Sequence, residues 1–153
     1  MKLIKFLAMM TQEDKELLTQ DLSGRFPYGI RCEVWYNDKI LNIKCTGIDF
    51  YTNTVNLDIP EDDNAKVYVD NIKPYLFPLS SMTGEQRNQL KEIWDIDMNK
   101  ALDYAISGEE GLSDLFQLSA AEKVINWLNK YHFDYRGLIG KGLAIDATNK
   151  NIY

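Results

Sequence analysis

Cysteine and histidine are scarce in this chain of 153 residues, which contains two cysteines and one histidine. Structural zinc sites usually need four Cys or His ligands, and disulfide frameworks need several cysteine pairs. Cys32 and Cys45 fall diagonally on neighbouring predicted strands, at about 7–8 Å, which is too far for an unstrained disulfide. The sequence therefore predicts two buried thiols, no metal site and no cofactor.

Basic clusters and long apolar runs are also missing. Lysine and arginine total 17 against 23 aspartates and glutamates, which gives a net charge of −6. Nucleic acid is a disfavoured partner, because its phosphates are bound by clustered Lys and Arg. The opening MKLIKFLAMM is interrupted by Lys5 and is shorter than the roughly 20 apolar residues of a membrane span. We therefore expect a cytoplasmic protein without a membrane partner.

The composition that remains is that of an ordinary globular protein, with 45% hydrophobic and 26% charged residues. We predict a single domain over 1–153 of class α+β. It would contain a small curled antiparallel sheet of about four strands, with an SH3-like partial barrel as one arrangement, packed with three to four helices. A mainly β half is predicted over 30–70, a mainly α half over 83–131 and a docked tail over 132–153. Residues 1–9 are predicted to be an N-terminal extension.

Alternating apolar residues predict the strands of the β half. A tight turn at Asn37-Asp38 sets Cys32 opposite Ile43, so that both inward faces meet. A second turn is predicted at Thr52-Asn53, with a β-bulge at Thr46-Gly47 that restores the inward parity of the middle strand.

A fourth strand is predicted within AKVYVDNI (65–72). The next segment, KPYLFP (73–78), contains two prolines, which cannot donate backbone hydrogen bonds. We therefore expect a connecting strap there and not a central strand.

Capping signals predict three helices, which begin after Thr11, Thr83 and Ser119. The last of these is expected to end near His132. Residues 97–106 have helical apolar spacing, although a hairpin at 99–100 is the alternative. Residues 107–118 are predicted to form a loop or a single helical turn.

The segment HFDYRGLIGKGLAIDAT (132–148) contains the only histidine. His132 is a typical general base and Asp134 could orient it, but no nucleophile accompanies them. We expect His132 at the C-terminal end of a helix, where the helix dipole stabilises its charged form. A hydrolase that uses His132 and Asp134 is the third functional hypothesis.

A ligand site is the second hypothesis for the same segment. The Arg136 guanidinium can clamp a carboxylate or phosphate while Tyr131 or Tyr135 stacks on a ring. Together with His132 these residues form the predicted ligand-binding set, for a nucleotide-sized anion. The alternative is that Asp134 and Arg136 attach the tail to the body.

Outward aromatic residues suggest a surface for a protein partner. Trp35 and Tyr68 both fall on the outward parity of their predicted strands. Outward Trp and Tyr can mark a partner-binding face, or they can lie beneath a helix. We take them as the predicted partner-binding residues, with the buried alternative left open.

Four stretches together resemble a set of small uncharacterised proteins from gut Bacteroidales genomes, mobile elements and phages. They are MTQEDKELLTQDL (10–22), RFPYGIRC (25–32), KPYLFPLSSMT (73–83) and WLNKYHFDYRGLIGKGLAIDAT (127–148). Gly84 departs from the acidic residue that this set has after SMT. The resemblance implies a bacterial or prophage accessory protein in the cytoplasm, with no activity attached. Members of the set tend to begin at Met10, which agrees with an extension over 1–9.

The first functional hypothesis is therefore a non-enzymatic protein-interaction or accessory protein that acts on a host protein. Binding of a small molecule is the alternative, and the sequence leaves the oligomeric state open.

Overall fold

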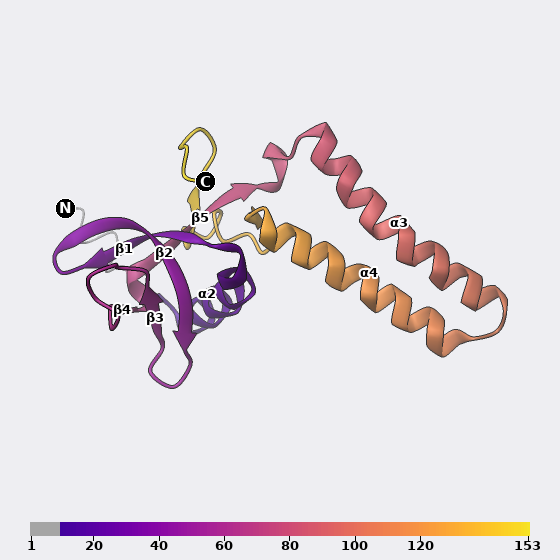
Figure 1. Ribbon diagram of the computed structural model, residues 1–153, viewed down its shortest axis with the longest axis horizontal. Helices are drawn as coiled ribbons and strands as arrows, with labels where there is room; N and C mark the ends of the chain where they lie inside the picture. The colour runs from indigo at the N-terminus through magenta and orange to yellow at the C-terminus, as the bar shows by residue number, and fades with distance from the viewer. Residues whose placement is uncertain (1–9) are drawn as a thin grey trace.

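The computed structural model describes residues 10–153, and the extension predicted over 1–9 lies outside the described residues. Within that range the predicted α+β class is confirmed, with three α-helices and a seven-stranded mixed sheet (Figure 1). The helices are α2 (Gln12–Arg25), α3 (Gly84–Ile106) and α4 (Glu110–Lys130). The strands are β1 (Arg31–Tyr36), β2 (Lys39–Asp49), β3 (Thr54–Leu57), β4 (Lys66–Tyr68), β5 (Ile72–Pro78), β6 (Phe133–Asp134) and β7 (Ile145–Asp146).

The β1–β2 hairpin has the predicted register. Cys32 lies opposite Ile43, and the turn residues Asn37 and Asp38 have positive φ angles of 48° and 60°. Two positive φ angles are what a type I′ turn needs, and Asn and Asp tolerate them. The predicted bulge is also confirmed, because the pairing of β2 with β3 shifts between Cys45 and Gly47.

The turn between β2 and β3 is longer than predicted. β2 ends at Asp49, and β3 begins at Thr54. The Asp49 carboxylate accepts hydrogen bonds from the backbone N–H groups of Tyr51 and Thr52, at 2.9 and 3.2 Å. These hydrogen bonds to the Asp49 side chain take the place of strand pairing at 50–53. The prediction of a two-residue turn at 52–53 is therefore wrong.

The prediction of a connecting strap at 73–78 is wrong, because this segment belongs to strand β5, which lies inside the sheet between β1 and the two short strands of the tail. Pro74 pairs with Cys32 at the end of the β1 ladder, and Pro78 is the last residue of β5. The missing donors therefore fall where pairing changes or stops. Beyond Pro74 the strand pairs in parallel with β7 and then with β6.

The sheet has the order β4-β3-β2-β1-β5-β6, with β7 beside β5, so it contains three strands more than predicted. The two end strands of this order, β4 and β6, do not pair with each other, so the sheet is not a closed barrel. Leu18 and Leu22 of α2 are fully buried in one cluster with inward residues of the sheet such as Cys32 and Val34. The main core therefore lies between α2 and the sheet. Cys32 and Cys45 are buried free thiols in this core, as predicted.

The helical half is one long antiparallel pair, α3 and α4, which we call the hairpin arm. Figure 1 shows it extending away from the sheet. Residues 97–106 are helical as predicted, but the loop predicted over 107–118 is wrong. Only 107–109 separate the helices, and Gly108 turns the chain with a φ of 81°.

Ser119 is inside α4 and does not cap it. Its hydroxyl donates to the Asp97 carboxylate of α3 at 2.8 Å, and the Phe116 ring stacks on the Tyr104 ring at 5.4 Å. These contacts between the helices stabilise a turn of α4 that local sequence signals do not show. Among residues 10–153, no helix combines the length and apolar character that a bilayer-spanning helix needs.

Candidate functional site

His132 lies just beyond α4, where the chain reverses into β6. It has a φ of 59°, its side chain is 6% exposed, and its ring stacks on Tyr153 at 4.0 Å. Burial of the ring, with a smaller contribution from the positive charge of Arg25, lowers the pKa of His132 to about 4. The expected stabilisation of its charged form is therefore wrong, because the ring is desolvated and does not lie at a solvated helix end.

Asp134 holds a turn of the tail. Its two carboxylate oxygens accept hydrogen bonds from the backbone N–H groups of Leu138 and Ile139, at 2.8 and 2.9 Å. Nδ1 of His132 is buried and has no hydrogen-bond partner among the described residues. The two side chains therefore do not form the hydrogen-bonded pair that the hydrolase hypothesis assumed.

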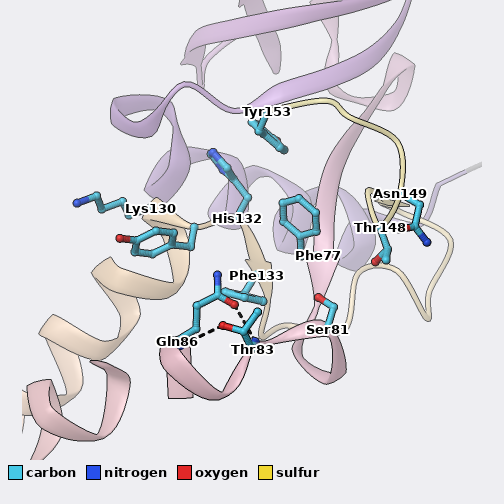
Figure 2. Close-up of a pocket in the computed structure, with 11 residues that line it drawn as sticks. Phe77, Ser81, Thr83, Gln86, Lys130, His132, Phe133, Thr148, Asn149 and Tyr153 are labelled. Carbon is cyan, nitrogen blue, oxygen red and sulfur yellow. Dashed lines mark hydrogen bonds between the residues drawn. The ribbon is translucent and has the colours of Figure 1, made fainter. Parts of the chain in front are cut away.

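A cavity of about 430 Å³ lies where the hairpin arm joins the sheet, and we call it the base cavity (Figure 2). It is lined by Phe77, Ser81, Thr83, Gln86, Lys130, Tyr131, His132, Phe133, Thr148, Asn149 and Tyr153. In Figure 2 the ring of Tyr153 lies at one end of the cavity, with Thr83 and Gln86 toward the other. Two predicted ligand-binding residues, Tyr131 and His132, line it, whereas Tyr135 and Arg136 do not.

Aromatic rings form part of the wall of the base cavity, and among the described residues its one charged lining residue is a lysine. Lys130 lies over the Tyr131 ring, with Nζ 5.5 Å from the ring centre. Within residues 10–153, no Asp or Glu side chain lines the cavity. The Tyr153 hydroxyl donates to the backbone oxygen of Tyr75 at 2.7 Å, and burial raises the pKa of Tyr153. This arrangement suits a planar ring with a negative charge.

Tyr135 and Arg136 belong to a separate buried cluster around Asp21. Arg25 donates to both oxygens of Asp21, at 2.8 and 2.9 Å, and both side chains are fully buried. Arg136 approaches the same carboxylate, with Nε 3.6 Å from Oδ1. The Tyr135 ring contacts both guanidinium groups, at 5.3 Å from Arg25 and 5.0 Å from Arg136. Arg136 therefore attaches the tail to α2 through Asp21, as the alternative predicted, whereas the hydrogen bonds of Asp134 stay within the tail.

The predicted partner-binding residues lie on separate strands. Trp35 is half-buried on β1, opposite Ile40 of β2. Tyr68 is exposed on β4, and β2 and β3 lie between β4 and β1 in the sheet. The sheet order therefore does not make these two aromatic residues cross-strand neighbours.

The hairpin arm carries apolar surface that the sequence interpretation missed. Arg87, Leu90, Lys91, Trp94 and Val124 line a groove of about 350 Å³ between α3 and α4. The same side of the arm carries further apolar residues at helical spacing. We define the hairpin face as Trp94, Met98 and Leu102 of α3 with Ala121, Val124 and Ile125 of α4. The four-residue spacing of 94, 98 and 102 could have predicted this face. It indicates one side of a helix only if 84–106 forms a single continuous helix.

The interior of the arm is partly polar. Asp97 is buried, and its carboxylate accepts hydrogen bonds from Lys123 at 2.6 Å and from Ser119 at 2.8 Å. These hydrogen bonds lower the pKa of Asp97, and the bond from Lys123 contributes most to the shift. Only Asp97 and Ala101 of α3 are fully buried, whereas large apolar side chains such as Leu102 remain exposed. The arm thus exposes much of its apolar surface.

Comparison of the chain with protein-family models, with curated proteins and with solved structures found no match. Within residues 10–153 no group of three or more His, Cys, Asp or Glu side chains is arranged to hold a metal ion.

Proposed function

We propose that the protein is a non-enzymatic interaction protein and that the hairpin arm is its docking element. The observation that supports this proposal is the hairpin face. Contiguous apolar surface on a soluble protein marks a site that another molecule covers. A projecting pair of helices cannot cover its own outer faces, because each helix packs on its partner along one stripe only.

Native mass spectrometry of the gently purified, untagged protein tests the docking role. We expect the chain to carry a bound polypeptide, which is either a copy of itself or another protein. Ile125→Glu places a charge on the hairpin face and should remove the bound polypeptide. Leu112→Glu is the matched control, because Leu112 is 40% exposed, Ile125 is 41% exposed, and Leu112 lies outside the face. A bare monomer before substitution, or equal effects of both variants, would contradict the proposal.

The resemblance to proteins of mobile elements and phages supports an accessory role in the cytoplasm of a bacterial host, with a host protein as the target. Trp35 and Tyr68 are the proposed contacts for that target. Alanine at either position should weaken capture of the host protein while circular dichroism shows an unchanged fold. Intact capture by both variants would exclude Trp35 and Tyr68 as contacts for the host protein.

The second candidate function is the binding of a small aromatic anion in the base cavity. It is supported by the aromatic rings that line the cavity and by Lys130, the one charged lining residue in the part of the chain that the structure describes. Trp127 is a natural reporter, because it lies 4.6 Å from the Tyr131 ring and 5.7 Å from the Phe133 ring.

Titration with adenosine monophosphate, followed by Trp127 fluorescence, tests this candidate. Trp35→Phe and Trp94→Phe remove the other tryptophans. We expect saturable quenching that Lys130→Ala weakens roughly tenfold, since the pair with the phosphate is lost. Arg136→Ala is the control and should change nothing, because Arg136 does not line the cavity. No saturable signal, or loss with Arg136→Ala alone, would overturn the assignment.

A further inference from the structure

We propose that the hairpin face is covered by a second copy of this chain, in an antiparallel four-helix bundle with a twofold axis near Met98. This inference rests on the docking role proposed above and names its partner. It is carried by the position of the apolar residues on the arm and by the charges at the two ends of the face.

The apolar residues form one continuous stripe on each helix. Trp94 and Val124 line the same groove, so they define one side of the arm. Met98 and Leu102 follow Trp94 at four-residue intervals, which keeps them on that side. Ala121 precedes Val124 by three residues, and Ile125 is four residues beyond Ala121. The stripes therefore lie side by side on the two helices.

The opposite side of the arm has a different character. Ile96 is two residues from Trp94, which places it about 200° around α3 at 3.6 residues per turn. On that side Lys123 reaches the Asp97 carboxylate and Lys100 lies over the Phe116 ring, with Nζ 5.4 Å from the ring centre. Two lysines therefore interrupt the apolar surface there, and the hairpin face is the better site for another apolar surface.

Opposite charges lie at the two ends of the hairpin face. Arg87 and Lys91 border the groove at the base of the arm. Glu110 and Asp114 precede Ala121 by roughly three and two turns of α4, so they share its side of the helix at the tip. Each pair is spaced by four residues. One end of the face is therefore positive and the other negative.

The two charged ends are placed symmetrically about Met98. Tyr104 stacks on Phe116, so Glu110 and Asp114 lie level with the end of α3. At 1.5 Å per residue, Lys91 and Arg87 are roughly 10–16 Å from Met98 along the arm, and Asp114 and Glu110 are roughly 12–18 Å from it in the other direction. A twofold axis at Met98 would lay α3 over the α3 helix of the partner copy and the base of one arm over the tip of the other. Arg87 and Lys91 would then face Glu110 and Asp114 of the partner diagonally, across one helix spacing of about 8–10 Å. Such a self-complementary surface is what a twofold dimer requires.

The size of the side of the arm that carries the hairpin face fits this partner. Helices of 23 and 21 residues are about 30 Å long, and two of them side by side are about 20 Å wide. The projected area is roughly 600 Å², which approaches the roughly 800 Å² of accessible surface that each partner buries in a standard interface. In this packing, Leu102 of one copy enters the groove beside Trp94 of the other.

Sedimentation equilibrium and light scattering of the full chain provide the first test. The expected mass is about 35 kDa, twice the 17.7 kDa of one chain. Leu102→Glu should raise the dimer Kd at least roughly tenfold, because it buries a carboxylate in the apolar centre. Ile96→Glu is matched in helix and exposure, at 58% against 59%, and should leave the Kd unchanged.

Charge reversal at the two ends of the face tests the antiparallel arrangement. The base variant Arg87→Glu/Lys91→Glu and the tip variant Glu110→Lys/Asp114→Lys should each dimerise roughly tenfold more weakly, because like charges meet at both ends. An equimolar mixture of the two variants should form a heterodimer as tight as the original, since opposite charges then meet at both contacts. Circular dichroism of each variant confirms the helical fold.

The outcomes separate this inference from the proposed function. A monomer at about 100 μM overturns the dimer, and so does a dimer that Leu102→Glu leaves intact or a mixture that does not recover affinity. If the monomer holds a different protein that Ile125→Glu releases, the docking role stands and only the identity of its partner is wrong. If the monomer holds nothing, both proposals fail.

Discussion

At the residue scale, His132 makes the stability of the protein sensitive to mild acid. Its pKa is about 4 in the folded protein, against an ordinary value of 6.5 in the unfolded chain. Between these pH values the unfolded chain binds more protons, so stability falls as the pH drops from about 6.5 to 4 and levels off below that. The full effect is about 3 kcal/mol.

Urea unfolding at pH 7.0 and pH 4.5 measures this term. Other acidic groups also titrate in this range, so the informative quantity is the difference between the original protein and His132→Asn. Asparagine tolerates the positive φ of this position and does not titrate. The original protein should lose about 2–3 kcal/mol more than the variant. Equal losses would show that the folded protein accepts a charged His132.

The buried ion pair of Arg25 and Asp21 should contribute more to stability than the exposed pair that Lys15 of the same helix forms with Asp70. Arg25→Ala should destabilise the protein by about 3–5 kcal/mol, because the buried Asp21 carboxylate loses two hydrogen bonds. Lys15 pairs with Asp70 at 3.0 Å on the surface, and Lys15→Ala should cost less than about 1 kcal/mol. Thermal unfolding of both variants compares the two losses, and similar values would contradict this account of Asp21.

At the element scale, the first turn of α3 depends on Thr83. Its hydroxyl accepts from the Gln86 N–H at 3.2 Å, and the Gln86 side chain accepts from the Thr83 N–H at 2.9 Å. Thr83→Ala should therefore cost about 1 kcal/mol. Ser80→Ala is the control at an exposed position outside this capping box and should be neutral within about 0.5 kcal/mol. Equal unfolding midpoints for the two variants would show that the capping box does not stabilise α3.

Sequence patterns predicted the elements that are determined by residues close together in the chain. The β1–β2 register follows from alternation and an Asn-Asp turn, and the Thr83 cap is confirmed by its hydrogen bonds. Ser119 carries the same capping pattern, yet it lies inside α4, because Phe116 and Ser119 are held by residues of α3. Tertiary contacts can extend a helix upstream of a residue that has a capping pattern. The sequence pattern alone does not distinguish such a residue from the real N-cap of the helix.

Elements built from distant residues were not predictable from local patterns. β5 pairs in parallel with β6 and β7, which lie more than fifty residues further along the chain. For the same reason, only two of the four residues predicted for the ligand site line the base cavity. Tyr131 and His132 face the base cavity, whereas Tyr135 and Arg136 lie beyond β6 and join the Asp21 cluster. Neighbours in sequence were thus separated by a two-residue strand.

At the scale of the whole molecule, the proposed dimer predicts that the hairpin arm depends on the partner copy for rigidity more than the sheet does. In the Leu102→Glu variant, backbone amides near the tip, in 103–113, should exchange with deuterium at least roughly tenfold faster than in the original protein. Amides of β1 and β2 serve as the internal control and should exchange equally in both proteins. Mass spectrometry of the exchanged peptides gives the comparison, and unchanged rates at the tip would contradict it.

The arm also connects two adjacent strands. The chain leaves the sheet at Pro78 and returns at Phe133, and Phe77 lies directly opposite Phe133 in the parallel ladder. Closing a flexible segment of roughly fifty residues would cost about 3.5 kcal/mol in chain entropy. A helical hairpin with a three-residue connection forms from contacts between near neighbours and brings its two ends together as it zips up. The helical hairpin therefore brings β5 and β6 together at a smaller cost in chain entropy than a flexible segment of the same length would.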